Sequence, residues 1–251
     1  MNTAKTPDAN SSASPQSDSA ALGDVEVVPL TRIQRFAAGI LARNWATIPH
    51  VTHHDEADIT ALEIMRNELA AREPQMKMSP LAFLVKAVVA ALQANPKLNA
   101  SMDASGANLV LKKYFNIGVA IDTPSGLLVA VIRECDRKGV TQIARELAAL
   151  TRKARAKGLT LEEMSGGSFT VSSLGGIGGT AFTPIINAPE VAILGVARTQ
   201  WKPTRGVDDR IDWRLVLPLS LSYDHRVVNG ADAARFMRAL ADELSSPAAL
   251  L

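Results

Sequence analysis

Two residues, His225 and Ser172, stand where side chains can do chemistry instead of filling a core. Apolar and polar residues alternate from Leu217 to Tyr223, which predicts a strand that ends near Asp224, immediately before His225. A histidine between a strand end and a following loop can face a site, and histidine suits proton transfer at neutral pH. His225 is therefore a candidate general base, although on position alone a surface or helix-capping histidine is the simpler interpretation.

Ser172 lies at the end of another expected strand, directly before a glycine-rich loop. The glycines at 176, 178 and 179 do not have the spacing of a dinucleotide fingerprint, and no Gly-Lys-Ser/Thr follows as in a phosphate-binding loop. Glycines at this density allow backbone to approach a ligand or a neighbouring chain closely. A serine at this place can donate a hydrogen bond to a developing oxyanion. The alternative is an ordinary loop with turn glycines.

The remaining reactive side chains indicate no further site. His50, His53 and His54 cluster with Asp55 and Glu56, which could suggest a metal site, but His53 and His54 point to opposite faces of a strand, so no metal geometry follows. Cys135 is the single cysteine, which excludes an intramolecular disulfide and makes a cysteine-based zinc cluster unexpected. The chain has no Gly-x-Ser-x-Gly elbow, so a serine hydrolase of the α/β class is unsupported.

Alternating helices and strands must position these candidates. Periodicity and capping signals predict a helix through 33–41 that ends before Pro49, and helices that begin at Thr60, at Ser79-Pro80, near 140 and near 231. Thr60 and Glu63 together resemble a capping box. The strands are expected at 50–54, 115–121, 127–132, 168–173, 191–197 and 215–223. This order predicts an α/β or α+β domain with a mixed sheet.

Composition sets the domain organisation and excludes several function classes. The 251 residues suit one large domain, 24–251, after a disordered tail or linker remnant at 1–23 that is rich in Ser, Ala, Asp, Asn and Pro. The net charge of +2 gives no general reason to expect a nucleic-acid partner. No apolar run is long enough to span a bilayer, and no secretion signal is evident, so the expected location is the cytoplasm.

The segment Asp224-His-Arg-Val-Val-Asn-Gly230 resembles the signature of dihydrolipoamide acyltransferases, the E2 components of 2-oxo acid dehydrogenase complexes. Further segments resemble the same catalytic domain in the same order, notably 28–34, 44–52, 55–60, 114–124 and 187–195. The segment 178–184 is most similar to the acetyl-transferring branch of pyruvate dehydrogenase complexes. Chloramphenicol acetyltransferase shares the signature, and the resemblance implies its two-layer sandwich with a mixed sheet.

The resemblance also implies a reaction and a set of site residues. An acetyl group would pass between coenzyme A and a dihydrolipoyl thiol, with His225 as general base and Ser172 as oxyanion donor. The family usually has Asp where this chain has Asn229, so the expected partner Arg32 would donate a hydrogen bond to a neutral acceptor instead of forming an ion pair. Asn229 can equally be the N-cap of the last helix. Arg66 is a candidate contact for a coenzyme A phosphate, with a solvated helix-face arginine as the alternative, and no metal is expected.

The partners implied by the resemblance are further copies of the chain and the other enzymes of a complex. The site would lie between subunits of a homotrimer, and eight trimers would join into a 24-chain cube through an apolar C-terminal knob, here Leu250 and Leu251. The chain contains no recognisable lipoyl attachment site, so the lipoyl domain would come from another chain or a missing segment. The E1 and E3 dehydrogenase components would complete the complex. The alternatives are another coenzyme-A-dependent acyltransferase of this fold and a non-catalytic assembly scaffold.

Overall fold

The computed structural model describes residues 22–73 and 78–250. The α-helices are α2 (Arg32–Thr47), α3 (Thr60–Arg72), α4 (Pro80–Ala94), α5 (Val140–Lys157), α6 (Leu161–Met164) and α7 (Gly230–Ser245). The strands are β1 (His50–Asp58), β2 (Ala100–Met102), β3 (Leu109–Leu111), β4 (Ile117–Thr123), β5 (Gly126–Ile132), β6 (Phe169–Ser173), β7 (Ala192–Val196), β8 (Gln200–Arg205) and β9 (Ile211–Asp224). Three 3-10 turns complete the elements: η1 (Pro96–Leu98), η2 (Val207–Asp209) and η3 (Pro247–Leu250).

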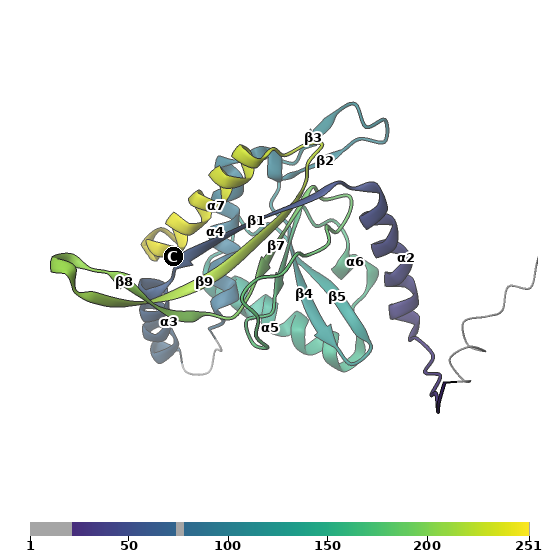
Figure 1. The fold of residues 1–251 in the computed structure, drawn as a ribbon, viewed down its shortest axis with the longest axis horizontal. Coiled ribbons are helices and arrows are strands. Elements are labelled where there is room, and N and C mark those ends of the chain that lie inside the picture. The colour runs from purple at the N-terminus through teal and green to yellow at the C-terminus, as the bar shows by residue number, and fades with distance from the viewer. Residues whose placement is uncertain (1–21, 74–77, 251) are drawn as a thin grey trace, which may run out of the picture. The chain divides into compact units, whose positions relative to one another are not determined.

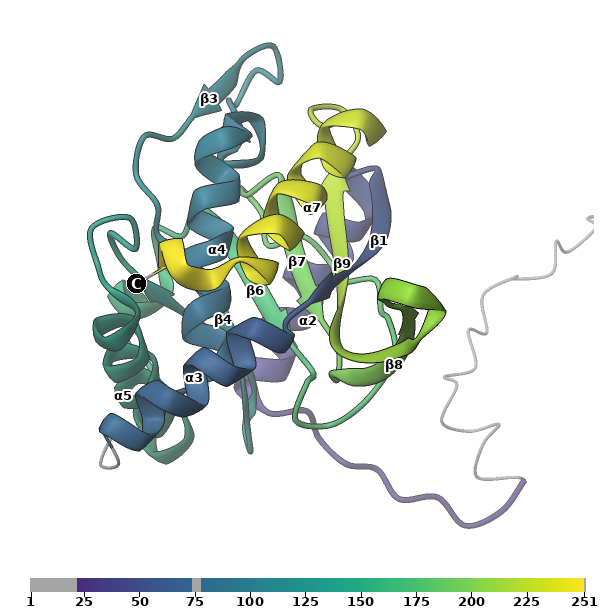
Figure 2. The ribbon, with the colours of Figure 1, turned by 90° about the vertical axis from the view of Figure 1, so that its left-hand side faces the viewer.

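A mixed sheet is the first of two layers. Its strand order is β1-β9-β7-β6-β4-β5, with β8 pairing beside it onto β9. Strands β4, β6 and β7 are parallel, and the other pairings are antiparallel. Helices α3, α4, α5 and α7 form the second layer against one face of the sheet, as Figures 1 and 2 show. The mixed-sheet α/β class expected from the sequence is therefore confirmed.

Helix α4 is the centre of the core because its sequence is apolar on nearly every side. Ser79 is its N-cap and accepts a hydrogen bond from the N–H of Leu81, while Pro80 occupies the first turn, where its missing N–H costs nothing. Nine of its fifteen residues are buried, and they pack in one cluster with α5, α7 and the inward face of the sheet. A helix that is apolar all round must be enclosed, which explains why α4 lies between its neighbours.

The two faces of the sheet differ in chemistry, and the alternation within each strand decides which side chain belongs to which face. Phe169 and Val171 on β6 belong to the helix-packed core cluster, so Thr170 and Ser172 point to the opposite face. Strand β9 follows the same rule, because its leucines at 217, 219 and 221 face the helices. Ser172 consequently lies on the face of the sheet opposite α4 and α7, in register with Gly195 of β7.

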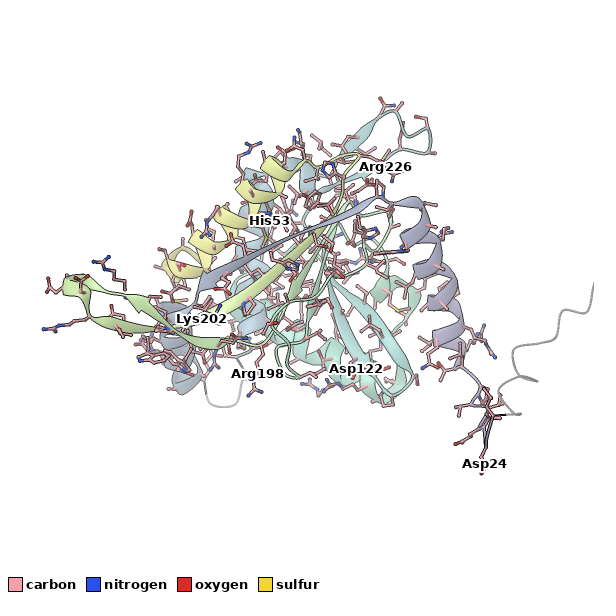
Figure 3. All side chains as sticks on the ribbon, in the orientation of Figure 1. Asp24, His53, Asp122, Arg198, Lys202 and Arg226 are labelled. Carbon is pink, nitrogen blue, oxygen red and sulfur yellow. The ribbon has the colours of Figure 1, made fainter. Side chains whose placement is uncertain are left out.

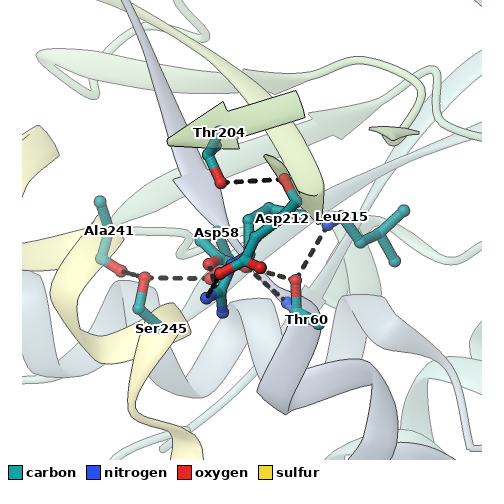
Figure 4. A network of polar contacts seen from close by, with 8 residues as sticks. Asp58, Thr60, Thr204, Asp212, Leu215, Ala241 and Ser245 are labelled. Carbon is teal, nitrogen blue, oxygen red and sulfur yellow. Dashed lines mark hydrogen bonds and ion pairs between the residues drawn. The ribbon is translucent and has the colours of Figure 1, made fainter. Parts of the chain in front are cut away.

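The capping box expected at Thr60 and Glu63 is wrong. Asp58 takes that place: its Oδ1 accepts hydrogen bonds from the Thr60 N–H at 2.9 Å and from the Thr60 hydroxyl at 2.6 Å. Thr60 Oγ1 in turn accepts from the Leu215 N–H at 2.9 Å, and Ser245 donates to the Asp58 carbonyl (Figure 4). Because the Asp58 carboxylate accepts the Thr60 N–H, the Thr60 hydroxyl oxygen can accept the Leu215 N–H and so connect α3 to β9.

Several short elements were not predicted from the sequence, namely β2, β3, β8 and α6. Strand β8 and the first half of β9 form a hairpin that extends beyond the other strands (Figure 1) and exposes Trp201 and Trp213. A capping box does form at Thr160 and Glu163, at the start of the four-residue helix α6. No helix among the described residues has the length and apolar character needed to cross a membrane.

The chain ends belong to two different parts of the structure. Contacts divide the chain at Thr31, and the compact unit begins at Arg32. The tail expected at 1–23 lies outside the described residues except for its last two positions. At the other end, Leu250 is 2% exposed and belongs to the core cluster through η3. Leu250, expected in an apolar knob that joins trimers, therefore packs in the core of its own chain instead, whereas Leu251 lies outside the described residues.

Candidate active site

His225 is an exposed residue that directly follows the buried end of β9, and it is held from both sides. Its backbone N–H donates to the Pro49 carbonyl at 3.0 Å, and its ring lies 5.8 Å from the ring of buried Tyr223. Asp224 and Arg226, the flanking residues, form an ion pair: Arg226 Nη2 is 2.6 Å from Asp224 Oδ2. The imidazole itself has no hydrogen bond to a described residue, and its side chain faces outward. This arrangement presents a basic ring on a braced backbone.

Ser172 has a hydroxyl that is available to a ligand. It is partly exposed, and it forms no hydrogen bond with another described residue. Its neighbour in register is Gly195, where the Phe182 ring lies 2.7 Å from the position a Cβ would take. The following loop contains no helix and places Gly179 at a φ of +87°, a conformation that favours glycine. The interpretation of this loop as neither a phosphate-binding nor a dinucleotide motif agrees with its geometry.

Within one chain the structure does not bring His225 and Ser172 together. Ser172 lies level with Ser220 across β7, whereas His225 lies five residues further along the chain, just beyond the end of β9. At about 3.4 Å per residue along the strand and about 4.8 Å between strands, the two residues are about 20 Å apart. Arg226, which follows His225, is labelled at the upper end of the sheet in Figure 3 and marks this end. A single chain therefore contains two separated halves of the expected site.

Asn229 caps helix α7, which was the alternative to its catalytic interpretation. Its side-chain oxygen accepts a hydrogen bond from the Asp232 N–H at 2.9 Å. The expected partner Arg32 begins α2, whose 16 residues extend for about 24 Å before β1 starts beside the His225 strand. The Arg32–Asn229 contact expected from the resemblance is not made within one chain, because the helix carries Arg32 away from this end of the sheet.

Arg66 is engaged within its own chain. Its guanidinium binds the Glu63 carboxylate through Nε and Nη2, the Asn67 side chain at 2.7 Å and the Met78 carbonyl at 3.1 Å. Hydrogen bonding to Glu63 raises its pKa. Helix α3 also begins where β1 ends, opposite the His225 end of the strand. This geometry gives no support to a phosphate contact, and Arg66 instead holds α3 to the segment before α4.

A buried carboxyl lies near the start of β7, close to the His225 end of the sheet. Glu190 is 4% exposed, and burial raises its pKa to about 7. Its Oε2 has no hydrogen-bond partner among the described residues, while Asn187 reaches Oε1 at 3.5 Å. Glu190 also borders a cavity of about 280 Å³ that includes Asp224 and Arg226. Sequence patterns missed this group, since an isolated glutamate after Ala-Pro carries no signal of burial.

The other titratable candidates have structural positions. His53 and His54 point to opposite faces, as expected, and His54 Nδ1 lies 2.9 Å from the Ser220 hydroxyl. Cys135 is buried, and burial raises the pKa of its thiol to about 11, so it is not a reactive thiolate. No cluster of three metal-ligating side chains occurs in the described part of the chain.

The sequence is similar to a known protein family and to named relatives. Residues 22–251 match the family described as 2-oxoacid dehydrogenases acyltransferase (catalytic domain). The chain is 54% identical over 224 residues to the dihydrolipoyllysine-residue acetyltransferase component of the pyruvate dehydrogenase complex of Cupriavidus necator, and 49% identical over 235 residues to that of Haemophilus influenzae. These matches cover 88% and 92% of this chain but 40% and 41% of the relatives, so the chain spans about two fifths of their length.

Solved structures show the same fold. The dihydrolipoamide acetyltransferase of Azotobacter vinelandii, studied for catalytic roles of a serine, a histidine and an asparagine, is 49% identical, with a TM-score of 0.90 over 93% of this chain and 96% of that chain. The cubic core of a pyruvate dehydrogenase multienzyme complex has the same score, identity and coverage. Chloramphenicol acetyltransferase, at 15% identity and a TM-score of 0.55 over 81% of this chain and 94% of that chain, shares the fold alone.

Proposed function

Because the chain belongs to the family of 2-oxoacid dehydrogenase acyltransferase catalytic domains, we propose that it transfers an acetyl group between coenzyme A and a dihydrolipoyl thiol. The relatives that are about half identical bear the name of this activity. The Azotobacter protein was studied for a histidine and an asparagine four residues apart, the spacing of His225 and Asn229 here. We propose His225 and Ser172 as the catalytic residues and Asn229 as a residue that supports them by capping α7.

The proposed reaction moves one proton and one acyl group. An alkyl thiol is mostly protonated at neutral pH, so His225 removes the proton from the dihydrolipoyl sulfur. The resulting thiolate attacks the thioester carbon of acetyl-coenzyme A, and the carbonyl oxygen becomes an oxyanion that Ser172 stabilises with its hydroxyl hydrogen. When the carbon–sulfur bond to coenzyme A breaks, the imidazolium returns the proton to the coenzyme A sulfur. The products are acetyl-dihydrolipoamide and free coenzyme A.

The observation that carries the proposal is the separation of the two side chains. His225 and Ser172 each present an available polar group, yet about 20 Å of sheet separates them in one chain. A working site needs the histidine of one copy beside the serine of another, as in a closed cyclic trimer. Exposed apolar side chains on α2, β5 and α6 support such an assembly, because a solitary chain would leave Phe36, Leu127 and Leu161 in water.

The same proposal covers the partners. We propose a homotrimer that assembles further into a 24-chain cube, in line with the similarity to the cubic core structure. The lipoyl group would arrive on a domain outside this segment or on another chain. The E1 and E3 dehydrogenase components would act on the lipoyl group before and after the acetyl transfer, respectively. The cytoplasm is the location that this assignment entails. Coenzyme A and dihydrolipoamide are substrates in this scheme, and no step calls for a metal.

A steady-state assay of the purified chain tests the activity. With acetyl-coenzyme A and free dihydrolipoamide, the chain should form acetyl-dihydrolipoamide, and His225→Ala should lower the rate by at least about 10²-fold. Chloramphenicol offered as the acceptor should not be acetylated. An assembled chain that acetylates chloramphenicol but not dihydrolipoamide would support a different acyltransferase of this fold, and one that acetylates neither would support the scaffold.

A further inference from the structure

The imidazole of His50 is engaged at both of its nitrogens. Nδ1 lies 2.8 Å from the Ile48 carbonyl oxygen, and Nε2 lies 3.0 Å from the Ile186 backbone nitrogen. A carbonyl only accepts and a backbone amide only donates, so the ring satisfies both when its hydrogen is on Nδ1. The ring also lies 5.2 Å from that of Trp45 at a tilted angle, which restricts its rotation.

The carbonyl group of Ile186 is held by a hydrogen bond as well. The Asn44 side chain donates to the Ile186 carbonyl at 3.0 Å, and both residues are buried, at 2% and 0% exposed. His50 and Asn44 therefore bind the N–H and the C=O of the same residue. Ile186 belongs to the long loop that leaves β6 one residue after Ser172 and returns at β7.

The same corner of the chain binds the backbone of His225. Pro49 directly precedes His50, and its carbonyl accepts the His225 N–H at 3.0 Å. His50 itself lies opposite Asp224 in the pairing of β1 with β9. The corner of residues 44–50 thus holds the loop that follows Ser172 and, through adjacent atoms, the strand end that carries His225.

We propose that His50 is a positioning residue of the acyl-transfer site. Its ring binds the loop after Ser172 at Ile186, while the adjacent Pro49 carbonyl binds the backbone of His225, so the two are held at a constant separation within each chain. The proposal rests on the proposed function, in which the histidine of one chain meets the serine of another. If His225 or Ser172 is displaced within each chain, every site of the assembly is misaligned. Misplacement by about 1 Å can cost about 10²-fold in rate.

Two substitutions separate the hydrogen bonds of His50. His50→Gln keeps an acceptor oxygen about where Nε2 lies, so the Ile186 N–H retains a partner. His50→Asn keeps a donor near Nδ1 but is too short to reach Ile186. Because both are uncharged amides, a difference between them reports the Ile186 hydrogen bond instead of general loss of the ring. His54→Asn is the matched control, since His54 lies on the same strand and face and also uses Nδ1 in a hydrogen bond.

The test combines steady-state kinetics with hydrogen exchange of the Ile186 amide on the assembled protein. We expect His50→Asn to lower kcat at least about tenfold, with KM for both substrates within about threefold. His50→Gln should recover kcat to within about threefold of the parent, and His54→Asn should match the parent. The Ile186 amide should exchange faster in His50→Asn than in His50→Gln. If His50→Asn fails to assemble, Asn44→Ser removes the other hydrogen bond to the same residue and should give the same selective loss of kcat.

The outcomes distinguish this proposal from the proposed function. An active parent with equal kcat in His50→Asn and His50→Gln, or with a change in KM alone, would overturn the positioning role. Unchanged Ile186 exchange in His50→Asn would overturn it independently of activity. A parent chain that shows a protected Ile186 amide but transfers no acetyl group would instead refute the proposed function and leave His50 a structural residue.

Discussion

Asp224 and Arg226, the residues directly before and after His225, form a bidentate ion pair. Arg226 Nε lies 2.9 Å from Oδ1 and Nη2 lies 2.6 Å from Oδ2, and Oδ1 also accepts the Arg226 backbone N–H at 3.0 Å. The Asp224 side chain is 4% exposed, whereas that of Arg226 is 45% exposed. The pair therefore closes the backbone into a tight turn that keeps His225 outside the strand.

We expect Arg226→Gln to lower acetyl transfer about tenfold, because the turn that presents His225 loses its brace. The substitution also leaves the buried Asp224 carboxylate without its guanidinium, which should cost about 1–3 kcal/mol of unfolding free energy. Arg235→Gln is the control, because the Arg235 side chain is 65% exposed and its partner Asp232 keeps a second ion pair with Lys97, so stability should change by less than about 0.5 kcal/mol. Kinetics and urea unfolding measure both effects. Equal behaviour of the two variants would argue against the brace.

Ser172 and Ser173 are neighbours on β6 that point to opposite faces of the sheet. We expect Ser172→Ala to lower kcat about 10²–10³-fold with little change in KM, because an oxyanion contact forms mainly in the transition state. Ser173→Ala should leave kcat within about twofold, since its hydroxyl hydrogen-bonds the Gly175 N–H. A large loss of kcat in Ser173→Ala instead would move the oxyanion role to the other serine.

Asn229 tests whether the cap or a charge matters at the start of α7. Asn229→Ala removes the acceptor for the Asp232 N–H and should destabilise the chain by about 1 kcal/mol. Asn229→Asp keeps the acceptor, and both residues are good N-caps, so stability and acetyl transfer should stay close to those of the parent. Thermal unfolding and steady-state rates compare the three proteins. If Asn229→Asp raised the rate of acetyl transfer tenfold or more, the negative charge usual in the family would contribute to activity, and the cap alone would not explain this position.

Glu190 should make stability depend on pH. Its pKa is raised from 4.5 to about 7 by burial, so the folded state binds more protons than the unfolded state between these values. The contribution of Glu190 to the free energy of unfolding is therefore fully present below about pH 4.5 and is lost as the pH rises through about 7. This loss is about 3 kcal/mol at most. Glu190→Gln should flatten this part of the profile. Urea unfolding at pH 5 and pH 8 measures it, with exposed Glu134→Gln as the control. A profile in Glu190→Gln as steep as that of the parent would contradict the assignment.

Elements with a local signal could be predicted from the sequence. Ser79 followed by Pro80 placed the start of α4 correctly, because an N-cap hydroxyl and a first-turn proline act on their immediate neighbours. The alternation that ends at Asp224 placed His225 at a strand end, and that is where it lies. The family resemblance supplied the fold class, and the structural comparison confirmed it.

The features that the sequence did not reveal depend on contacts between distant segments. The Thr60–Glu63 pattern predicted a capping box, but Asp58 competes for the same N–H and Glu63 binds Arg66 instead. The Arg32–Asn229 contact is not made within one chain because the direction of α2 is decided by packing, not by any local pattern. The two hydrogen bonds of His50 join residues 136 positions apart in one case and two in the other, and no motif signals the longer one.

The measurement that tests the account most directly is complementation between two inactive variants. His225→Ala and Ser172→Ala chains are dissociated, mixed in equal amounts and reassembled, and acetyl transfer from acetyl-coenzyme A to dihydrolipoamide is measured. If each site takes its histidine from one chain and its serine from another, about a quarter of the sites regain both groups, and about a quarter of the parent activity should return. Activity that stays at the level of the separate variants in a properly reassembled mixture would contradict a site shared between chains.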